Sequence, residues 1–269
     1  MQHIYKIILV IVLFCLPAKA QIKLCSWNVE NIGKSKSEKN IEFMANILRD
    51  FDIVAIQEVV AGYGGAQAVA KLADNLNRKG AKWDFIISNP TTGSTYKTER
   101  YAFLWKTAKL KLKGTPWLEE KFKLEIDREP FYATFIFNGN EFTIANFHAI
   151  TKSKQPETEI KYFKFLPAQY PNLNIIFLGD FNCPQSHTVF FPLKKMGYAS
   201  VFQNQKTSLK KECRKDNCLA SEFDNIWYNT LKNRVGNNHV IHFYKEFESL
   251  KEAREISDHI PITSELYFN

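Results

Sequence analysis

Short apolar runs alternate with amphipathic stretches along most of this chain of 269 residues. Alternation of apolar and polar residues predicts a strand over Ile22–Val29, and apolar runs predict buried strands over Ile53–Gln57 and Asn174–Leu178. Asn138-Gly139-Asn140 separates two further apolar runs and is typical of a hairpin turn. The other expected strands are Trp83–Ser88, Tyr101–Trp105, Phe131–Phe137, Glu141–Phe147, Asp224–Tyr228, His239–Phe243 and Ile262–Tyr267.

Four segments have the spacing of helices that bury one face. Ser37–Arg49 places Ile41, Met44, Ala45 and Leu48 on a common side. The other three expected helices are Gln67–Arg78, Glu157–Tyr170 and Val189–Met196. No repeat, linker or change of composition divides the chain, so the sequence predicts one domain of mixed strands and helices over residues 21–269.

The first 20 residues have the pattern of a secretory signal peptide. Lys6 precedes an apolar run from Ile7 to Leu16, and Ala18-Lys19-Ala20 supplies the small residues that a signal peptidase requires, so we expect cleavage after Ala20. No run of 18 apolar residues occurs, so the sequence predicts no membrane anchor. The expected location is outside the cytoplasm, either periplasmic or extracellular.

Composition and charge narrow the class of protein. A content of 45% hydrophobic and 14% aromatic residues excludes collagen-like and disordered chains. The net charge of +8 falls to +6 when Lys6 and Lys19 are removed with the signal peptide. A basic secreted protein is attracted to polyanions such as nucleic acid, although the same charge also serves solubility.

Four cysteines remain after cleavage, Cys25, Cys183, Cys213 and Cys218, and they allow three disulfide connectivities. Export permits disulfides. Cys213 and Cys218 are close enough in sequence to close a small loop, and this pairing is favoured. Cys25 lies in an apolar strand and is expected to be a buried thiol. The spacing does not resemble a zinc site.

Polar residues that can carry chemistry gather where the apolar strands end: Asn28, Glu58, His148, Asp180 and Asn182. Strand ends are where α/β folds build their sites. Glu58, Asn28 and Asp258 offer hard oxygen ligands of the kind that Mg²⁺ prefers.

Asp180 is suited to orient or deprotonate a water, and the Asn182 amide to bind a phosphoryl oxygen. His148 and His259 could act as an acid and a base in phosphodiester hydrolysis if each were oriented by a carboxylate. Glu99 and Asp224 are the expected partners of the two histidines.

These residues, taken in order, resemble the endonuclease/exonuclease/phosphatase superfamily, and most closely its pancreatic deoxyribonuclease branch. The resemblance spans nearly the whole mature chain and rests on eight short motifs. They are Trp27-Asn28, Gln57-Glu58-Val59, Glu99-Arg100-Tyr101, Arg128-Glu129-Pro130, His148, Gly179-Asp180-Phe181-Asn182, Phe223-Asp224 and Ser257-Asp258-His259-Ile260-Pro261.

The resemblance implies a four-layered α/β sandwich, in which two mixed, mostly antiparallel sheets pack face to face between outer helices. It implies phosphodiester hydrolysis with Mg²⁺ or Mn²⁺, and leaves room for a structural or activating Ca²⁺. By motif, Glu58 would be the principal metal ligand, assisted by Asn28 and Asp258. His148 with Glu99 and His259 with Asp224 would be the acid–base pairs, in an order left open.

The resemblance also assigns residues to the substrate, which would be DNA, preferably double-stranded, bound by a monomer. Asp180 would position water, while Asn182, Arg128 and Asn28 would hold phosphate. The segment from Ser94 to Tyr101 is similar to the loop that addresses the DNA minor groove in this branch. Within it, Tyr96 would pack on sugar or base, and Lys97 and Arg100 would meet phosphates.

Three departures from the branch pattern bear on specificity. Val60 stands where the pattern has a minor-groove arginine, Thr98 is an extra residue before Glu99, and Phe223 replaces a tyrosine before Asp224. The family pattern also implies Cys183–Cys218 as a competitor to Cys213–Cys218.

The leading hypothesis is a secreted endonuclease of low sequence specificity. One alternative is a phosphoesterase of the same fold that acts on a phospholipid or another small phosphoester. The other is a polyanion-binding module with vestigial catalytic machinery. Its anion-binding residues would be basic ones such as Lys210, Lys211, Arg214 and Lys215.

Overall fold

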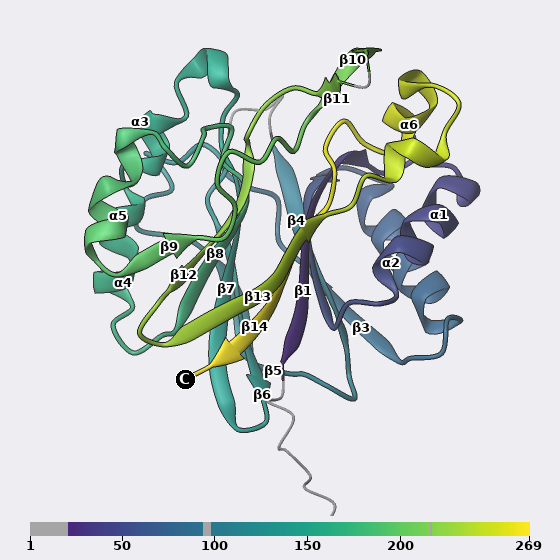
Figure 1. Ribbon diagram of the computed structural model, residues 1–269. Helices are drawn as coiled ribbons and strands as arrows, with labels where there is room; N and C mark the ends of the chain where they lie inside the picture. The colour runs from purple at the N-terminus through teal and green to yellow at the C-terminus, as the bar shows by residue number, and fades with distance from the viewer. Residues whose placement is uncertain (1–20, 94–97, 216) are drawn as a thin grey trace, which may run out of the picture.

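The computed structural model describes residues 21–93, 98–215 and 217–269 (Figure 1). The expected signal peptide and Tyr96 and Lys97 therefore lie outside the described residues. The strands are β1 Ile22–Ile32, β2 Ile53–Val60, β3 Trp83–Ile87, β4 Glu99–Lys106, β5 Lys111–Leu118, β6 Phe131–Phe137, β7 Asn140–His148, β8 Ile175–Asp180, β9 Tyr198–Ser200, β10 Leu209–Arg214, β11 Asn217–Leu219, β12 Asp224–Asn229, β13 Asn233–Val240 and β14 Ile262–Phe268.

The described residues contain fewer α-helices than strands. The α-helices are α1 Glu38–Leu48, α2 Gly65–Asn77, α3 Glu157–Ile160, α4 Leu166–Gln169, α5 Phe191–Lys195 and α6 Leu250–Ile256. Single 3₁₀ turns occupy Lys152–Lys154, Phe163–Phe165, Thr188–Phe190 and Phe243–Glu246. Among the described residues, no helix has the length and apolar character needed to cross a bilayer.

Two six-stranded sheets form the centre of the molecule, in the orders β13-β14-β1-β2-β4-β3 and β5-β6-β7-β8-β12-β9. Each sheet has one parallel pair, β1 with β2 and β7 with β8, and its other neighbours are antiparallel. Parallel strands end at the same edge, so each pair brings two carboxyl ends together. The four strand ends carry polar residues that the sequence analysis identified as candidates for the site.

Alternation along the strands explains the four layers. In β1, Cys25, Trp27 and Val29 pack on the helix side, with residues of α1, α2 and α6, whereas Leu24 packs between the sheets. The inner core is rich in phenylalanine, including Phe103 and Phe135 with ring centroids 5.9 Å apart. Figure 1 shows α1, α2 and α6 on one side of the sheets and α3, α4 and α5 on the other. The predicted four-layered α/β sandwich is confirmed.

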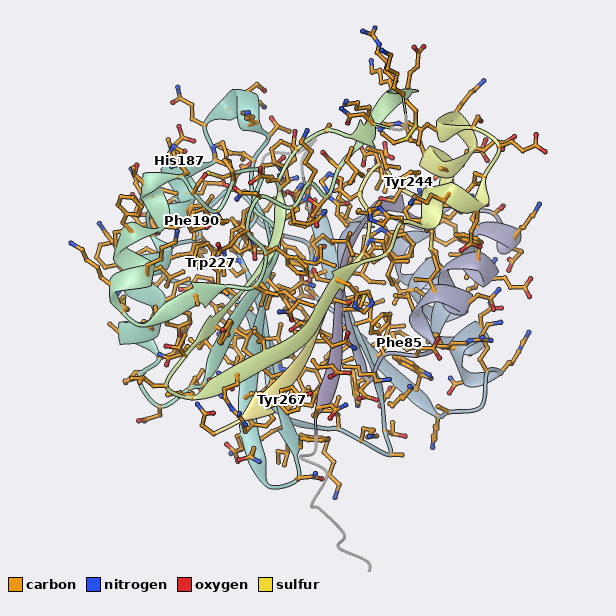
Figure 2. All side chains as sticks on the ribbon, in the orientation of Figure 1. Phe85, His187, Phe190, Trp227, Tyr244 and Tyr267 are labelled. Carbon is orange, nitrogen blue, oxygen red and sulfur yellow. A yellow bond between two sulfur atoms is a disulfide. The ribbon has the colours of Figure 1, made fainter. Side chains whose placement is uncertain are left out.

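The outer face of the second sheet packs against an aromatic layer. Phe190 and Trp227 stack with ring centroids 4.5 Å apart, and both are labelled in Figure 2 on the side of α5. Phe163 adds a ring 4.7 Å from that of Phe147 on β7. Aromatic pairs of this kind each add about 0.5–1.5 kcal/mol beyond the area they bury.

Several predicted elements are confirmed. Phe131–Phe137 is a strand with the predicted bounds, and Asn138 and Gly139 both have positive φ, as a tight hairpin turn requires. The Cys213–Cys218 disulfide is present, while Cys25 and Cys183 are free and buried, so the Cys183–Cys218 alternative is wrong.

Other element predictions were wrong. The continuous helix over Glu157–Tyr170 is broken into short pieces, and at the last break Pro167, in the first turn of α4, has no N–H with which to continue the preceding turn. The strand predicted at His239–Phe243 lies earlier, at β13, and Phe243 begins a 3₁₀ turn. β5, β9, β10, β11 and α6 were not predicted.

Candidate active site

The candidate site lies where the carboxyl ends of β1, β2, β7 and β8 meet. Asn28 and Gln57 are paired in register on one sheet, and His148 and Asp180 on the other. Buried polar side chains join the sheets directly beneath the site: Gln57 Nε2 donates to Asn146 Oδ1 at 2.6 Å, and Asn146 Nδ2 donates to the Ile56 carbonyl at 3.0 Å. These bonds fix the register of one sheet against the other.

Glu58 is aimed into the site by a bulge. The register of β2 against β4 shifts between Ile56 and Val59, and Glu58 has φ +60, a left-handed value that is uncommon for a residue with a side chain. Its side chain is 21% exposed, and Oε1 accepts a hydrogen bond from Asn28 Nδ2 at 2.9 Å. The irregular backbone thus delivers a carboxylate that a regular strand would direct elsewhere.

The first histidine pair, His148 with Glu99, is buried and held by Arg128. His148 Nδ1 lies 2.9 Å from Glu99 Oε2, and Arg128 Nη1 donates to the same oxygen at 3.2 Å. Arg128 Nη2 also donates to the Ala149 carbonyl. Burial lowers the pKa of His148, but the Glu99 carboxylate and its hydrogen bond raise it by more, so the pKa lies above its ordinary value.

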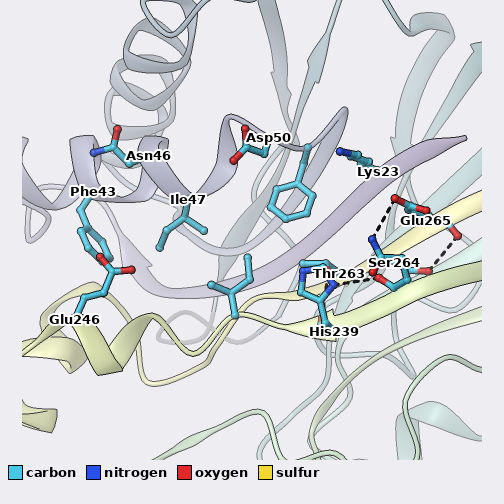
Figure 3. Close-up of a pocket in the computed structure, with 13 residues that line it drawn as sticks. Lys23, Phe43, Asn46, Ile47, Asp50, His239, Glu246, Thr263, Ser264 and Glu265 are labelled. Atoms are coloured by element: carbon cyan, nitrogen blue, oxygen red, sulfur yellow. Dashed lines mark hydrogen bonds between the residues drawn. The ribbon is translucent and has the colours of Figure 1, made fainter.

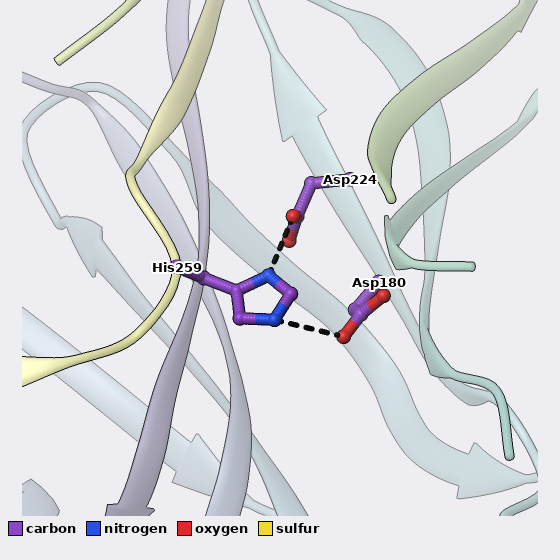
Figure 4. A group of neighbouring side chains, drawn as sticks. All are labelled: Asp180, Asp224 and His259. Carbon is purple, nitrogen blue, oxygen red and sulfur yellow. Dashed lines mark hydrogen bonds and ion pairs between the residues drawn. The ribbon is translucent and has the colours of Figure 1, made fainter. Parts of the chain in front are cut away.

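The second pair, His259 with Asp224, lies beside Asp180 (Figure 4). His259 Nδ1 is 2.7 Å from Asp224 Oδ2, and the hydroxyl of Thr207 donates to that same oxygen at 2.6 Å. Trp27 Nε1 donates to the His259 carbonyl at 2.8 Å and so positions its backbone. Burial lowers the pKa of His259, but Asp224 and Asp180 raise it by more, so it lies well above the ordinary value.

Asp180 lies between the two histidines. Its Oδ2 is 3.5 Å from His148 Nε2 and 3.6 Å from His259 Nε2, and it accepts a hydrogen bond from Asn28 Nδ2 at 3.2 Å. Burial raises the pKa of Asp180, but the two histidines and the Asn182 N–H lower it by more, and the net pKa is below its ordinary value. An ionised carboxylate facing two histidine Nε2 atoms can orient a water or a phosphoryl oxygen between them.

The predicted phosphate-binding residues differ in whether their N–H groups already donate hydrogen bonds within the protein. Arg128 lines the cleft, and its buried Nε–H has no partner among the described residues. Asn182 Nδ2 donates to the Ala149 carbonyl at 3.0 Å. Arg100 donates to the carbonyls of Ala61 and Ser88 at 3.0 and 2.8 Å, so these contacts hold backbone in place. The phosphate roles of Asn182 and Arg100 stay predictions.

The donor set fits a hard divalent cation in part. Glu58 Oε1 and Asp180 Oδ2 approach the same Asn28 amide nitrogen, so two carboxylate oxygens converge there. Asn28 Oδ1 accepts from the Glu30 N–H at 3.0 Å, so as placed its donor end faces the carboxylates. Asp258 forms an ion pair with Arg254 at 3.4 Å. Asp180, Asp224 and His259 also lie close enough to share an ion, although the 2.7 Å histidine–carboxylate bond already occupies two of them.

An open cleft of about 470 Å³ lies beside these groups, and its lining includes Glu58, Glu99 and Arg128 of the site, with Asn31, Val60 and Lys154 among others. A second cavity of similar volume lies between α1 and the β13–β14 edge (Figure 3). Its lining includes Phe43 and Ile47, and its polar groups bond to one another, as Asn237 Nδ2 does to Glu265 Oε1 at 3.2 Å. Glu58, Glu99 and Arg128 belong both to this lining and to the site, so the first cleft is the approach to the candidate site.

Two positioning residues were missed by the sequence analysis. Thr207 holds Asp224, and it lies in a loop whose polar composition gives no signal. Glu159 is buried, and it accepts the N–H groups of Asp127 and Ile150 at 2.6 and 2.9 Å. A carboxylate on the apolar face of a short helix is the one signal that could have identified Glu159.

Comparisons with known proteins agree with this geometry. A deoxyribonuclease from Thioalkalivibrio sp. (strain K90mix) is 28% identical, and the match covers 95% of this chain and 73% of that protein. Human deoxyribonuclease gamma is 26% identical, over 96% of this chain and 90% of that protein. A mannosyl-6-phosphatase from Bacteroides thetaiotaomicron has a similar fold, with a TM-score of 0.66 at 19% identity, over 92% of this chain and all of that one.

The human Nocturnin catalytic domain shares the fold as well, with a TM-score of 0.64 at 16% identity over 93% of this chain and 95% of that one. The sequence profile of the Endonuclease/Exonuclease/phosphatase family matches residues 25–259, which include every candidate site residue. The chain belongs to the Endonuclease/Exonuclease/phosphatase family.

Proposed function

We propose that this enzyme is a divalent-metal-dependent endonuclease that cuts DNA with low sequence specificity. The observation that carries the proposal is the placement of Asp180 between two histidines, each held by its own carboxylate. Phosphodiester hydrolysis needs one group to take a proton from the attacking water and another to give one to the leaving oxygen. Relatives named deoxyribonuclease support DNA as the substrate.

Each histidine has its Nε2 as the working atom. Because Nδ1 of His148 and of His259 is bonded to a carboxylate, that bond fixes the tautomer and leaves Nε2 facing Asp180. One Nε2 accepts the proton of the attacking water and the other donates a proton to the leaving oxygen. Asp180 holds the water, and the guanidinium of Arg128, which lines the cleft, binds a non-bridging phosphate oxygen.

Glu58, with Asp180 beside it, would hold the divalent cation, and Asn28 and Asp258 remain candidate ligands. A bound Mg²⁺ or Mn²⁺ supplies positive charge over the phosphoryl group as negative charge develops. Without a cation, the two carboxylates repel an anionic substrate, and we therefore expect activity to require one.

The enzyme is proposed to act as a monomer on double-stranded DNA outside the cytoplasm. Met1–Ala20 has the pattern of a signal peptide, and the Cys213–Cys218 disulfide is typical of an oxidising compartment. The proposed duplex substrate is supported by the open shape of the cleft and the net charge of +6 after cleavage.

A second candidate substrate is a small phosphoester. Val60 lines the cleft where the deoxyribonuclease pattern has an arginine, and a volume of about 470 Å³ suits a small ligand as well. A phosphatase with the same fold supports this alternative.

The test is nicking of supercoiled plasmid by residues 21–269 with Mg²⁺, with Mg²⁺ plus Ca²⁺, and with EDTA. We expect nicking with Mg²⁺, none with EDTA, and a loss of at least about 10³-fold in Glu58→Gln and His148→Ala. Glu141→Gln, an exposed residue at the end of β7 opposite His148, is the matched control and should cut normally. Hydrolysis of small phosphoesters without nicking by the folded wild type would favour the alternative.

A further inference from the structure

A small basic hairpin stands beside the candidate site. β10 and β11 pair antiparallel, Leu209 with Leu219 and Arg214 with Asn217, and the Cys213–Cys218 disulfide joins them near the tip. Figure 1 shows the pair at the end of the molecule where the carboxyl ends of β1, β2, β7 and β8 lie, next to α6. The proposed catalytic mechanism does not use this hairpin, although the sequence analysis gave four of its cations to the alternative of a polyanion-binding module.

The base of the hairpin is attached to the segment that carries His259. Leu209 N–H donates to the Asp258 carbonyl at 2.7 Å, and Ile260 N–H donates to the Thr207 carbonyl at 2.8 Å. Arg254 Nη1 donates to the Leu209 carbonyl at 3.1 Å, which ties α6 to the same strand. These bonds fix the direction in which the hairpin leaves the catalytic segment.

The hairpin carries an unbalanced positive charge. From residue 206 to 219 the sequence has five cationic and two acidic residues, Glu212 and Asp216, for a net charge of +3. Lys211, Arg214 and Lys215 are exposed. Among the described residues, none of the five cations forms an ion pair, although lysines elsewhere do, such as Lys113 with Glu141. A cluster of unpaired cations repels itself, so an external anion would stabilise it.

The disulfide restricts the conformation of the loop that carries part of this positive charge. It closes a loop of sequence separation 5 between Cys213 and Cys218, directly beside Arg214 and Lys215. A short stapled loop has little conformational freedom left to lose when it binds, so cations on it contact a ligand at a smaller entropic cost than cations on a flexible loop. Solubility alone would not require the charges to be held in one place.

We infer that the basic hairpin, residues 206–215 with β11, is an arm that grips the phosphate backbone of duplex DNA beyond the bond being cut. This inference rests on the proposed endonuclease function and adds a binding surface outside the cleft. A six-residue strand spans about 17–20 Å. DNA rises 3.4 Å per base pair, so the tip would meet phosphates about five base pairs from the site. Backbone contacts of this kind add affinity without sequence preference.

The test compares two triple variants with equal loss of charge. The hairpin triple is Lys211→Gln, Arg214→Gln and Lys215→Gln. The control triple is Lys82→Gln, Lys109→Gln and Lys111→Gln, three exposed residues near the end of β4 opposite the site. Binding of a labelled 30-base-pair duplex is measured by anisotropy in EDTA over a range of salt concentrations, and plasmid nicking with Mg²⁺ gives KM and kcat.

We expect the hairpin triple to raise the KM for plasmid at least about tenfold and to reduce the slope of log affinity against log salt by about 2–3, since each phosphate contact contributes about 0.9. The control triple should change both quantities much less. Circular dichroism and the count of free thiols verify that each variant is folded and keeps its disulfide.

Equal behaviour of the two triples, or no duplex binding by the wild type, would overturn the inference. If the wild type binds duplex through the hairpin but cuts none with any metal, the inference stands and the proposed endonuclease function fails. If it cuts and the two triples are equivalent, the function stands and the hairpin has no part in it.

Discussion

Glu159 faces neither the cleft nor solvent, yet the candidate site depends on it. Its two oxygens accept the N–H groups of Asp127 and Ile150, which directly flank Arg128 and Ala149. The Ala149 carbonyl in turn accepts hydrogen bonds from Arg128 and from Asn182. One buried carboxylate therefore joins two loops that carry candidate phosphate-binding groups. Burial raises the pKa of Glu159 above its ordinary value, and its two backbone hydrogen bonds oppose that shift.

Glu159→Gln tests this positioning role. The amide has one acceptor oxygen and a nitrogen that donates, so at least one of the two backbone N–H groups loses its partner. We expect a loss of about 1–3 kcal/mol in the free energy of unfolding in urea. We also expect plasmid nicking to slow by at least about tenfold through displacement of Arg128.

The half-buried Glu157, two residues earlier on α3, gives the matched control Glu157→Gln. It should leave both stability and nicking close to those of the wild type. Normal nicking by Glu159→Gln would contradict the positioning role, even if its stability falls.

Cys183 gives a second prediction at the residue scale, on pH. Burial raises the pKa of its thiol from 9.0 to about 12, so the neutral thiol dominates throughout the physiological range. Thiolate is the reactive form, and at pH 8 its fraction falls about 10³-fold relative to an ordinary cysteine. We expect Cys183 in a Cys25→Ala variant to react with a disulfide reagent about 10³-fold more slowly in the native protein than in urea, and faster as pH rises.

In urea, the wild-type mature chain should then show two reactive thiols, Cys25 and Cys183. Reaction of Cys213 in the unreduced protein would contradict the Cys213–Cys218 pairing. Fast native reaction of Cys183 at pH 8 would contradict the burial of its thiol.

At the scale of elements, the parallel pair β7–β8 depends on a glycine. Gly179 has φ +130, and a Cβ there would lie 1.9 Å from the Phe147 carbonyl oxygen. The close approach of the two strands places His148 beside Asp180 in register. Glycine is therefore required both for its backbone conformation and for the space it leaves.

Gly179→Ala is expected to reduce the free energy of unfolding by about 3–5 kcal/mol, because strain and a backbone clash add together. Gly139→Ala isolates the strain, since Gly139 also has positive φ, at +81, but has no atom within 4 Å of the added Cβ. Gly139→Ala should reduce the free energy of unfolding by about 1–2 kcal/mol. Urea unfolding of both variants checks the difference, and equal losses would show that the clash is relieved by movement of the strands.

Strands with strong local signals were the predictable part of the fold. Phe131–Phe137 and the Asn138-Gly139 turn are specified by residues within the hairpin itself. β5 was missed because Gly114 and Pro116 interrupt its pattern, and both are tolerated at an edge strand with a register shift between Lys113 and Trp117. The signal for α6 was present, because Ser249 caps the helix by accepting the Glu252 N–H.

The candidate site was predictable to the extent that its residues sit at strand ends. His148, Asp180 and Glu58 come together because the parallel strands end at one edge. The contribution of Thr207 was not predictable, because it comes from a loop whose path is set by tertiary contacts to Asp224 and Ile260. The side-chain amide of Asn182 likewise bonds the Ala149 carbonyl, a contact that no local pattern encodes.

At the scale of the whole molecule, the sandwich holds charges of like sign close together. Glu58 Oε1 and Asp180 Oδ2 come from different sheets and share one Asn28 amide nitrogen. Packing of the two sheets thus brings the carboxylates together, and their repulsion opposes the fold until a cation lies between them. A ligand that binds the folded state alone stabilises it by mass action, so cation binding should be measurable as global stability.

Thermal unfolding of residues 21–269 tests this coupling independently of catalysis. At a free Mg²⁺ concentration ten times the dissociation constant, the gain is about 1.4 kcal/mol, which raises Tm by about 3–6 °C for a domain of this size. Glu58→Gln should be insensitive to Mg²⁺, because one of the converging carboxylates is gone, whereas Glu141→Gln should respond as the wild type does. A Tm of the wild type that is the same in Mg²⁺ and in EDTA would contradict a cation site at the junction of the sheets. If Glu58→Gln keeps the Mg²⁺-dependent rise in Tm, the cation ligands are instead Asp180, Asp224 and His259, which also lie close enough to share an ion.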